Sequence, residues 1–165
     1  MSYVDFTLKA VLDCKPSIEK KLKEIGANFI AEEFQHDFYF QVPNGKLKFR
    51  KSTIRSLITH YERIKIGNIE KTRVYRYDLN PSKREIDLLF ETSELIGEIK
   101  KTRKIYQFQN STIHLDLPVT GGVFLEIETK GFDGNKSENE LEVEAKQVFQ
   151  LIGIKPDQLV ETGYF

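Results

Sequence analysis

The sequence has very little cysteine and no excess of either charge. Cys14 is the single cysteine among 165 residues, which excludes internal disulfide bonds and any zinc site built from several cysteines. The three histidines, His36, His60 and His114, are scattered, which argues against a histidine-rich metal site. Lys and Arg together number 25, as do Asp and Glu, so no net field attracts DNA or an anionic membrane. We therefore expect neither a nucleic-acid nor a membrane partner.

Long apolar segments are absent as well. No run approaches the roughly 20 apolar residues that a membrane-spanning helix needs. The first residues, Met1-Ser2-Tyr3-Val4-Asp5, lack the basic and apolar regions of a signal peptide, so we expect a cytoplasmic protein. Hydrophobic residues make up 39% of the chain, with 12 Phe and 7 Tyr, which is enough to build a core. At this length we expect a single domain over residues 1–165.

Eight segments are typical of β-strands, because apolar and polar residues alternate along them or aromatic residues accumulate. They are residues 3–13, 28–42, 46–51, 56–63, 70–79, 99–108, 112–118 and 123–132. Three helices are expected at residues 16–26, 81–95 and 138–152. Asn80 and Pro81 are the expected N-cap and first residue of the second helix. Ser137 and Glu140 have the spacing of a capping box at the start of the third.

The predicted order is β-α-β-β-β, repeated once and followed by a closing helix. A weak internal repeat supports two related halves: Asp13 with Pro16-Ser17 recurs 65 residues later as Asp78 with Pro81-Ser82. Two four-stranded halves can close into one barrel, which leaves no exposed strand edge. The expected fold class is therefore α+β, a closed eight-stranded antiparallel β-barrel made of two β-α-β-β-β halves, with the helices packed outside.

The polar faces of these strands would line the inside of such a barrel. The helices need an apolar surface, so the face with Phe6 and Leu8 is expected to point outward. The opposite faces carry convergent cations and several carboxylates: Lys9, Lys48, Arg50, Arg63, Lys101 and Arg103, and Asp5, Asp116, Glu126 and Glu128. On one strand, alternating charges are typical of a solvated face. When the pattern recurs on strand after strand and helices cover the apolar side, it favours a charged tunnel.

The enclosed charges indicate what the tunnel would bind. Burying unpaired ions costs several kcal/mol each, so ligands of opposite charge are expected. Convergent Lys and Arg suit a phosphate chain, and clustered carboxylates suit Mg²⁺ or Mn²⁺. Such an ion would neutralise phosphates and polarise phosphorus, which indicates metal-assisted phosphoryl or nucleotidyl transfer. His114 lies on the same face beside Asp116. We interpret it as a structural histidine, with a general acid or base as the alternative.

Six segments, in order, carry a resemblance to a known family. They are Gln35-His36-Asp37-Phe38-Tyr39-Phe40, Gly45-Lys46-Leu47-Lys48-Phe49-Arg50, Leu57-Ile58-Thr59-His60-Tyr61-Glu62-Arg63, Lys101-Thr102-Arg103-Lys104-Ile105-Tyr106, Ile113-His114-Leu115-Asp116 and Gly122-Val123-Phe124-Leu125-Glu126-Ile127-Glu128. With these segments the sequence resembles the CYTH superfamily, the triphosphate tunnel metalloenzymes, and within it the class IV adenylyl cyclase-like branch.

The resemblance implies a tunnel that binds a triphosphate-containing small molecule with Mg²⁺ or Mn²⁺. It implies phosphate-binding roles for Lys9, Lys48, Arg50, Arg63, Lys101 and Arg103. Lys9, Lys101 and Arg103 are also the candidate catalytic residues. It implies metal-binding roles for Asp5, Asp116, Glu126 and Glu128.

The resemblance leaves the activity open. The leading interpretation is conversion of ATP to cyclic AMP and pyrophosphate. The alternatives are a triphosphatase acting on thiamine triphosphate or tripolyphosphate, and a polyphosphate- or nucleotide-binding module without turnover. The family's opening strand reads Glu-x-Glu-x-Lys, whereas Asp5, Thr7 and Lys9 stand here. Because the second glutamate is missing, a binding module without turnover remains an alternative. The oligomeric state also stays open, a homodimer included.

Overall fold

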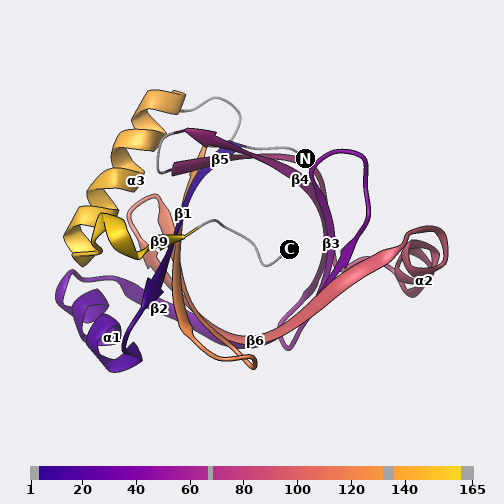
Figure 1. Ribbon diagram of the computed structural model, residues 1–165, viewed down its shortest axis with the longest axis horizontal. Coiled ribbons are helices and arrows are strands. Elements are labelled where there is room, and N and C mark those ends of the chain that lie inside the picture. The colour runs from indigo at the N-terminus through magenta and orange to yellow at the C-terminus, as the bar shows by residue number, and fades with distance from the viewer. Residues whose placement is uncertain (1–3, 67–68, 132–135, 161–165) are drawn as a thin grey trace.

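Eight antiparallel strands close into a ring, as Figure 1 shows. The structure is a computed structural model that describes residues 4–66, 69–131 and 136–160. The strands of the ring are β1 (Val4–Leu12), β2 (Asn28–Phe40), β3 (Lys46–Ser52), β4 (Ser56–Ile66), β5 (Ile69–Leu79), β6 (Leu95–Phe108), β7 (Ser111–Pro118) and β8 (Val123–Gly131). They pair in the order β5-β4-β3-β2-β6-β7-β8-β1, and β1 also pairs with β5, which closes the ring. A short strand, β9 (Leu159–Val160), pairs with β1.

Three α-helices and one 3₁₀ turn complete the described fold: α1 (Lys15–Glu24), α2 (Lys83–Thr92), α3 (Glu138–Ile152) and η1 (Pro156–Gln158). The element order β1-α1-β2-β3-β4 and β5-α2-β6-β7-β8 confirms the two predicted halves. Within the described ranges, no helix has the length and apolarity needed to cross a membrane.

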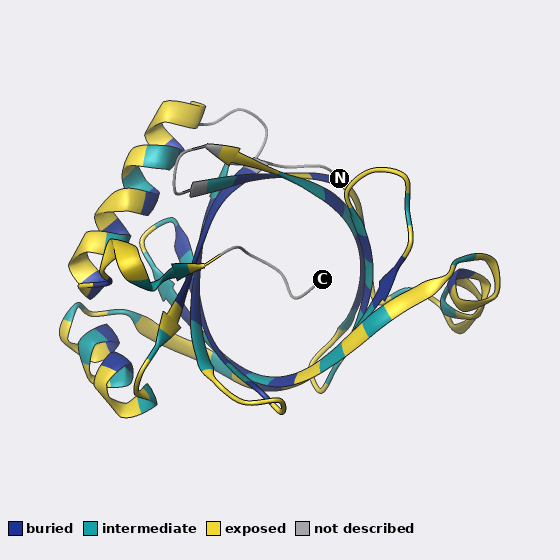
Figure 2. Cartoon of the chain, viewed as in Figure 1, coloured by how far each residue is buried: buried dark blue, intermediate teal, exposed yellow. Residues whose placement is uncertain are grey.

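The apolar core lies outside the ring, between its outer face and the helices. Phe6 and Leu8 of β1 pack with Leu141 and Val148 of α3, in a cluster that also includes Leu22 of α1. A second cluster joins α2 to the outer face of β2, β3 and β4. Figure 2 shows the buried helix positions turned toward the strands. Because the helices cover the apolar faces, the polar faces of the strands turn to the inside, as predicted.

The start of α2 differs from the sequence prediction. Ser82, not Asn80, is the N-cap: its hydroxyl accepts a hydrogen bond from the Glu85 backbone N–H, and the Glu85 carboxylate accepts one from the Ser82 N–H. This pairing satisfies two N–H groups at the helix end. Asn80 instead has a φ of 50° and accepts a hydrogen bond from the Ser56 N–H.

The end of α2 also comes earlier than predicted, and β6 begins at Leu95 rather than residue 99. Residues 95–99 are drawn into the sheet because they pair with Asp37–Phe40 of β2. The other predicted strands are found with shifts of a few residues at their ends. Residues 3 and 132, which end two predicted strands, lie outside the described residues.

Candidate functional site

The inner face of the ring encloses a polar cavity of about 190 Å³. Its charged lining includes six of the predicted site residues, which come from β1, β3, β4, β6 and β8: Asp5, Lys48, Arg50, Arg63, Arg103 and Glu128. A smaller adjoining cavity shares much of this lining and adds Lys101 and Glu126. Lys9 and Asp116 are buried next to these groups: Lys9 stands in register with Glu126, and its ammonium lies 4.8 Å from the centre of the Phe124 ring. The predicted site residues are thus brought together in one region.

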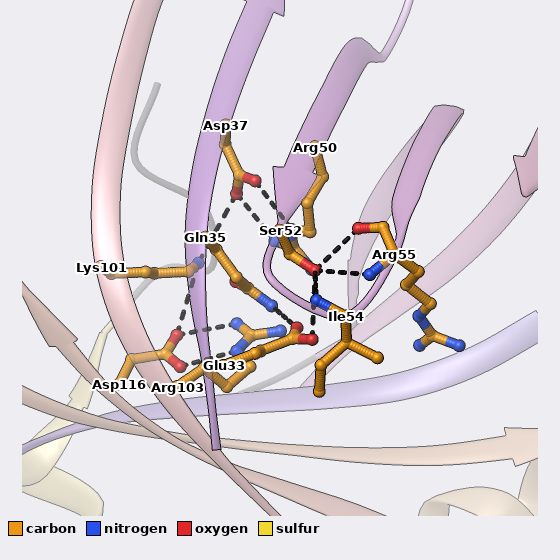
Figure 3. A network of polar contacts seen from close by, with 10 residues as sticks. All are labelled: Glu33, Gln35, Asp37, Arg50, Ser52, Ile54, Arg55, Lys101, Arg103 and Asp116. Atoms are coloured by element: carbon orange, nitrogen blue, oxygen red, sulfur yellow. Dashed lines mark hydrogen bonds and ion pairs between the residues drawn. The ribbon is translucent and has the colours of Figure 1, made fainter. Parts of the chain in front are cut away.

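Two arginines of the cavity are each held by an aspartate on the neighbouring strand (Figure 3). Nε and Nη2 of Arg50 donate to both carboxylate oxygens of Asp37, at 2.7 Å each. Arg103 donates to Asp116 in the same manner, also at 2.7 Å. The Lys101 ammonium lies between the pairs, 3.7 Å from Asp37 and 3.5 Å from Asp116. The network therefore fixes three cations of the tunnel in position.

The two ion pairs mirror each other with reversed charge. Each joins residues 13 positions apart on adjacent strands, β2 with β3 and β6 with β7. In the first pair the aspartate precedes the arginine, and in the second it follows. Arg103 and Asp116 stand 66 positions after Asp37 and Arg50, in keeping with the weak internal repeat. Lys101 joins the two halves because it contacts the aspartate of each.

The network shifts the pKa values of its members. Burial alone would raise the pKa of Asp37, but Arg50 and Lys48 hold it well below the usual range. The pKa of Asp116 is likewise held low against burial by Arg103 and Lys101. Burial, followed by the nearby Arg103, lowers the pKa of Lys101 to about 8. Asp116, predicted as a metal ligand, is thus placed as the anionic partner of Arg103 and Lys101.

Lys48 and Arg63 are cations of a different kind. Among the residues that the structure describes, neither has a carboxylate within ion-pairing distance. The Lys48 ammonium instead lies 5.4 Å from the centre of the Tyr61 ring and 5.9 Å from that of Tyr39. The Arg63 guanidinium lies 5.0 Å from the Tyr61 ring, and its buried Nε has no hydrogen-bond partner among the described residues. Burial and the neighbouring Arg50 lower the pKa of Lys48 well below its ordinary value. Both cations therefore have bonding capacity for an anion.

His114, Glu126 and Glu128 form a group that fits a divalent ion. One ligand atom from each lies within 4.8 Å of the others. The buried Nδ1 of His114 has no hydrogen-bond partner among the described residues and lies 4.0 Å from a Glu126 oxygen. Burial and Arg103 hold the pKa of His114 well below 6.5, which keeps the imidazole in the neutral form that binds metals. One imidazole with two carboxylates suits Mn²⁺, and the carboxylates also suit Mg²⁺.

Sequence reasoning treated His114 as structural and missed this grouping. The signal is the register of β7 against β8, which sets His114 opposite Glu126 and Thr112 opposite Glu128. Inward residues on adjacent strands meet only once that register is known.

The first strand places Asp5 near this group but outside it. The Thr7 hydroxyl donates to the Asp5 carboxylate at 3.1 Å and lies 3.3 Å from the Thr72 hydroxyl. Burial and the nearby Glu128 carboxylate raise the pKa of Asp5 to about 7. Thr7 is therefore a neutral group that hydrogen-bonds the Asp5 carboxyl.

Residues 8–164 match the CYTH domain. A Methanocaldococcus jannaschii protein named as a candidate adenylate cyclase is 25% identical over 169 residues, which covers 98% of this chain and 96% of that protein. A Pyrococcus horikoshii OT3 structure has a TM-score of 0.79 and 27% identity, over 94% of each chain. A candidate adenylyl cyclase from Hippeastrum, described as having a dominant triphosphatase activity, shares the fold at 10% identity, with a TM-score of 0.63 over 92% of this chain and 88% of that one.

Proposed function

Because the chain belongs to the CYTH family, we propose that it binds ATP with Mg²⁺ or Mn²⁺ inside the ring and converts it to cyclic AMP and pyrophosphate. The observation that carries the proposal is the pair of cations Lys48 and Arg63, which form no ion pair with any described residue and share one cavity with Glu126 and Glu128. A phosphate chain supplies the missing anionic oxygens. The name of the M. jannaschii relative, which aligns over nearly the whole chain, supports the cyclase as the leading activity.

The residues of the cavity divide the work in this proposal. Lys48 and Arg63 bind phosphate oxygens directly. Arg50 and Arg103 bind phosphate through the guanidinium N–H groups that do not bond to Asp37 and Asp116. The two aspartates thus act by positioning the arginines. Lys9 and Lys101 add positive charge from the wall of the tunnel. Together these groups would hold the phosphates in one orientation while charge develops on the departing pyrophosphate.

His114, Glu126 and Glu128 would hold the divalent ion in this proposal, with Asp5 behind them on β1. When bound, such an ion neutralises phosphate charge and polarises the phosphorus. In the reaction, the ribose 3′-oxygen attacks the α-phosphorus, the bond to the oxygen that bridges to the β-phosphorus breaks, and pyrophosphate leaves. The 3′-hydroxyl proton is released to solvent.

Thr7 favours a second candidate, binding of the triphosphate without turnover. Replacing a carboxylate by a hydroxyl removes a ligand that hard cations prefer, and Asp5 is already hydrogen-bonded to Thr7. Thr7→Glu is therefore expected to raise the affinity for Mn²⁺, measured by calorimetry. If Thr7→Glu and Glu126→Gln both leave Mn²⁺ affinity unchanged, the metal part of the proposal is wrong.

Product analysis tests the activity. The protein is incubated with ATP, thiamine triphosphate or tripolyphosphate, each with Mg²⁺ and with Mn²⁺, and the products are separated by chromatography. Cyclic AMP and pyrophosphate from ATP support the proposal. Release of phosphate instead makes the protein a triphosphatase, and binding in calorimetry without any product makes it a binding module. The control is the double variant Lys48→Met, Arg63→Gln. If the wild type binds none of the three compounds, the proposal is overturned.

A further inference from the structure

One side of the larger cavity, the one of about 190 Å³, is lined by hydrogen-bond acceptors rather than by cations. Glu33 and Gln35 of β2 are only 4% and 1% exposed, and both belong to the lining. Nε2 of Gln35 donates to one carboxylate oxygen of Glu33, and the Ser52 hydroxyl lies 3.3 Å from the other (Figure 3). Among the described residues no cation lies within ion-pairing distance of Glu33. The hydrogen-bond partners of the Glu33 side chain within the described ranges are thus neutral side chains.

The side-chain oxygen of Gln35 adds a second acceptor. Oε1 is buried and has no hydrogen-bond donor among the described residues. The orientation of the amide follows from its neighbour, because turning it over would set an amide oxygen against the Glu33 carboxylate. A buried acceptor without a partner costs about 1–3 kcal/mol, so a ligand that brings a donor gains by pairing with it.

A phosphate chain cannot supply these donors. Ionised phosphate oxygens accept hydrogen bonds, and their charge is repelled by Glu33. The same cavity also has an apolar part, to which Leu57, Val74 and Ile105 contribute. Apolar walls with a few placed polar groups are typical of sites for organic ligands.

We infer that Glu33 and Gln35 recognise an organic group bearing N–H or O–H donors that is attached to the triphosphate. The acceptors orient the ligand, because its phosphates are drawn to Lys48 and Arg63 and its donors to β2. Inorganic tripolyphosphate fills only the cationic part. The inference rests on the proposed function and adds a selection for organic triphosphates over inorganic ones. In ATP the donors are the ribose hydroxyls or the 6-amino group of adenine, and the two sources can be separated by analogues.

The test compares two ligands by calorimetry with Mn²⁺: α,β-methylene-ATP, whose methylene group replaces the bridging oxygen at the bond to be broken, and tripolyphosphate. Glu33→Gln is expected to weaken α,β-methylene-ATP by about tenfold to a hundredfold, as loss of a hydrogen bond to a charged group predicts. Tripolyphosphate should bind as well as before or more tightly, because a repelling charge is removed. Gln35→Met should also weaken the ATP analogue alone.

The matched control is Glu32→Gln, on the same strand with a side chain 53% exposed and directed toward Lys104. It should change neither affinity. Analogues of the ligand without the 2′- and 3′-hydroxyls, or without the 6-amino group, identify which donor is read. The inference is overturned if Glu33→Gln and Gln35→Met weaken both ligands equally or neither, or if wild-type protein prefers tripolyphosphate. In those cases triphosphate binding itself stands. Failure of the wild type to bind either ligand would instead refute the proposed function.

Discussion

Replacing Asp37 by Asn should destabilise the protein strongly. The Asp37 side chain is 0% exposed and is the shared anion of Arg50, which it binds through both oxygens, and of Lys101, which is 2% exposed. Without the carboxylate charge, Lys101, which is almost fully buried, and Arg50, whose side chain is 14% exposed, both lose their anionic partner. Removing one member of a buried ion pair costs about 3–5 kcal/mol. For a chain of this length each kcal/mol lowers the melting temperature by roughly 2–4 °C. We therefore expect a drop of roughly 6–20 °C.

Thermal melting followed by circular dichroism measures this drop, with Asp78→Asn as the control. Asp78 also pairs with an arginine, Arg76, but the two side chains are 39% and 43% exposed. Such a surface pair contributes only about 0–1 kcal/mol. Tripolyphosphate should narrow the gap between Asp37→Asn and wild type, because it returns negative charge to the network and stabilises the folded state by mass action. If Asp37→Asn melts within about 2 °C of wild type, or no lower than Asp78→Asn, the reasoning on the buried network is wrong.

Three further predictions concern separate parts of the molecule. Arg63→Gln should weaken tripolyphosphate binding in calorimetry by about tenfold to a hundredfold. It should barely change the melting temperature, since Arg63 forms no ion pair with a carboxylate in the described part of the chain. The pKa of Lys101 is lowered from 10.5 to about 8, so the affinity for triphosphate should fall as the pH rises through 8. The contribution of Lys101 to the free energy of unfolding should increase between pH 8 and 10.5, because in that range Lys101 is protonated only in the unfolded chain. Lys101→Met should abolish both trends. Gly45 and Gly26 both have positive φ, but only at Gly45 would an added Cβ clash with the backbone oxygen of Tyr61. Gly45→Ala should therefore have a lower melting temperature than Gly26→Ala, and equal melting temperatures would contradict this.

The sequence predicted the ring and its inward charges because strand alternation is a local signal. Once Phe6 and Leu8 are assigned to the helix-covered face, the position of Lys9 follows. The start of α2 was wrong because Asn80, Pro81 and Ser82 all suit a helix N-terminus. What decides between them is a hydrogen bond from Ser56, 24 residues away in the chain. Contacts of that kind do not show in the local pattern.

The ion pairs inside the tunnel could not be predicted from the sequence for a related reason. Lys101 contacts Asp37 because β6 lies beside β2, a neighbour from the other half of the chain. Neither that adjacency nor its register follows from alternation alone. For the same reason Arg50 and Arg103 were predicted only as phosphate ligands, without the aspartates that orient them. Glu33, which carries the inferred ligand selection, was not among the predicted site residues.

The double pairing of β1 has a consequence for biosynthesis. Val4–Thr7 pairs with β5, and the whole strand pairs with β8, up to the contact of Val4 with Gly131. Of the eight strands of the ring, β1 is synthesised before the others but cannot complete its pairing until β8 has been made. Contacts this distant along the chain slow folding, because loop closure must come before the contacts that reward it. Until Gly131 has been synthesised, β1 lacks its β8 partner and keeps an unpaired strand edge, which is the kind of surface that promotes aggregation of folding intermediates.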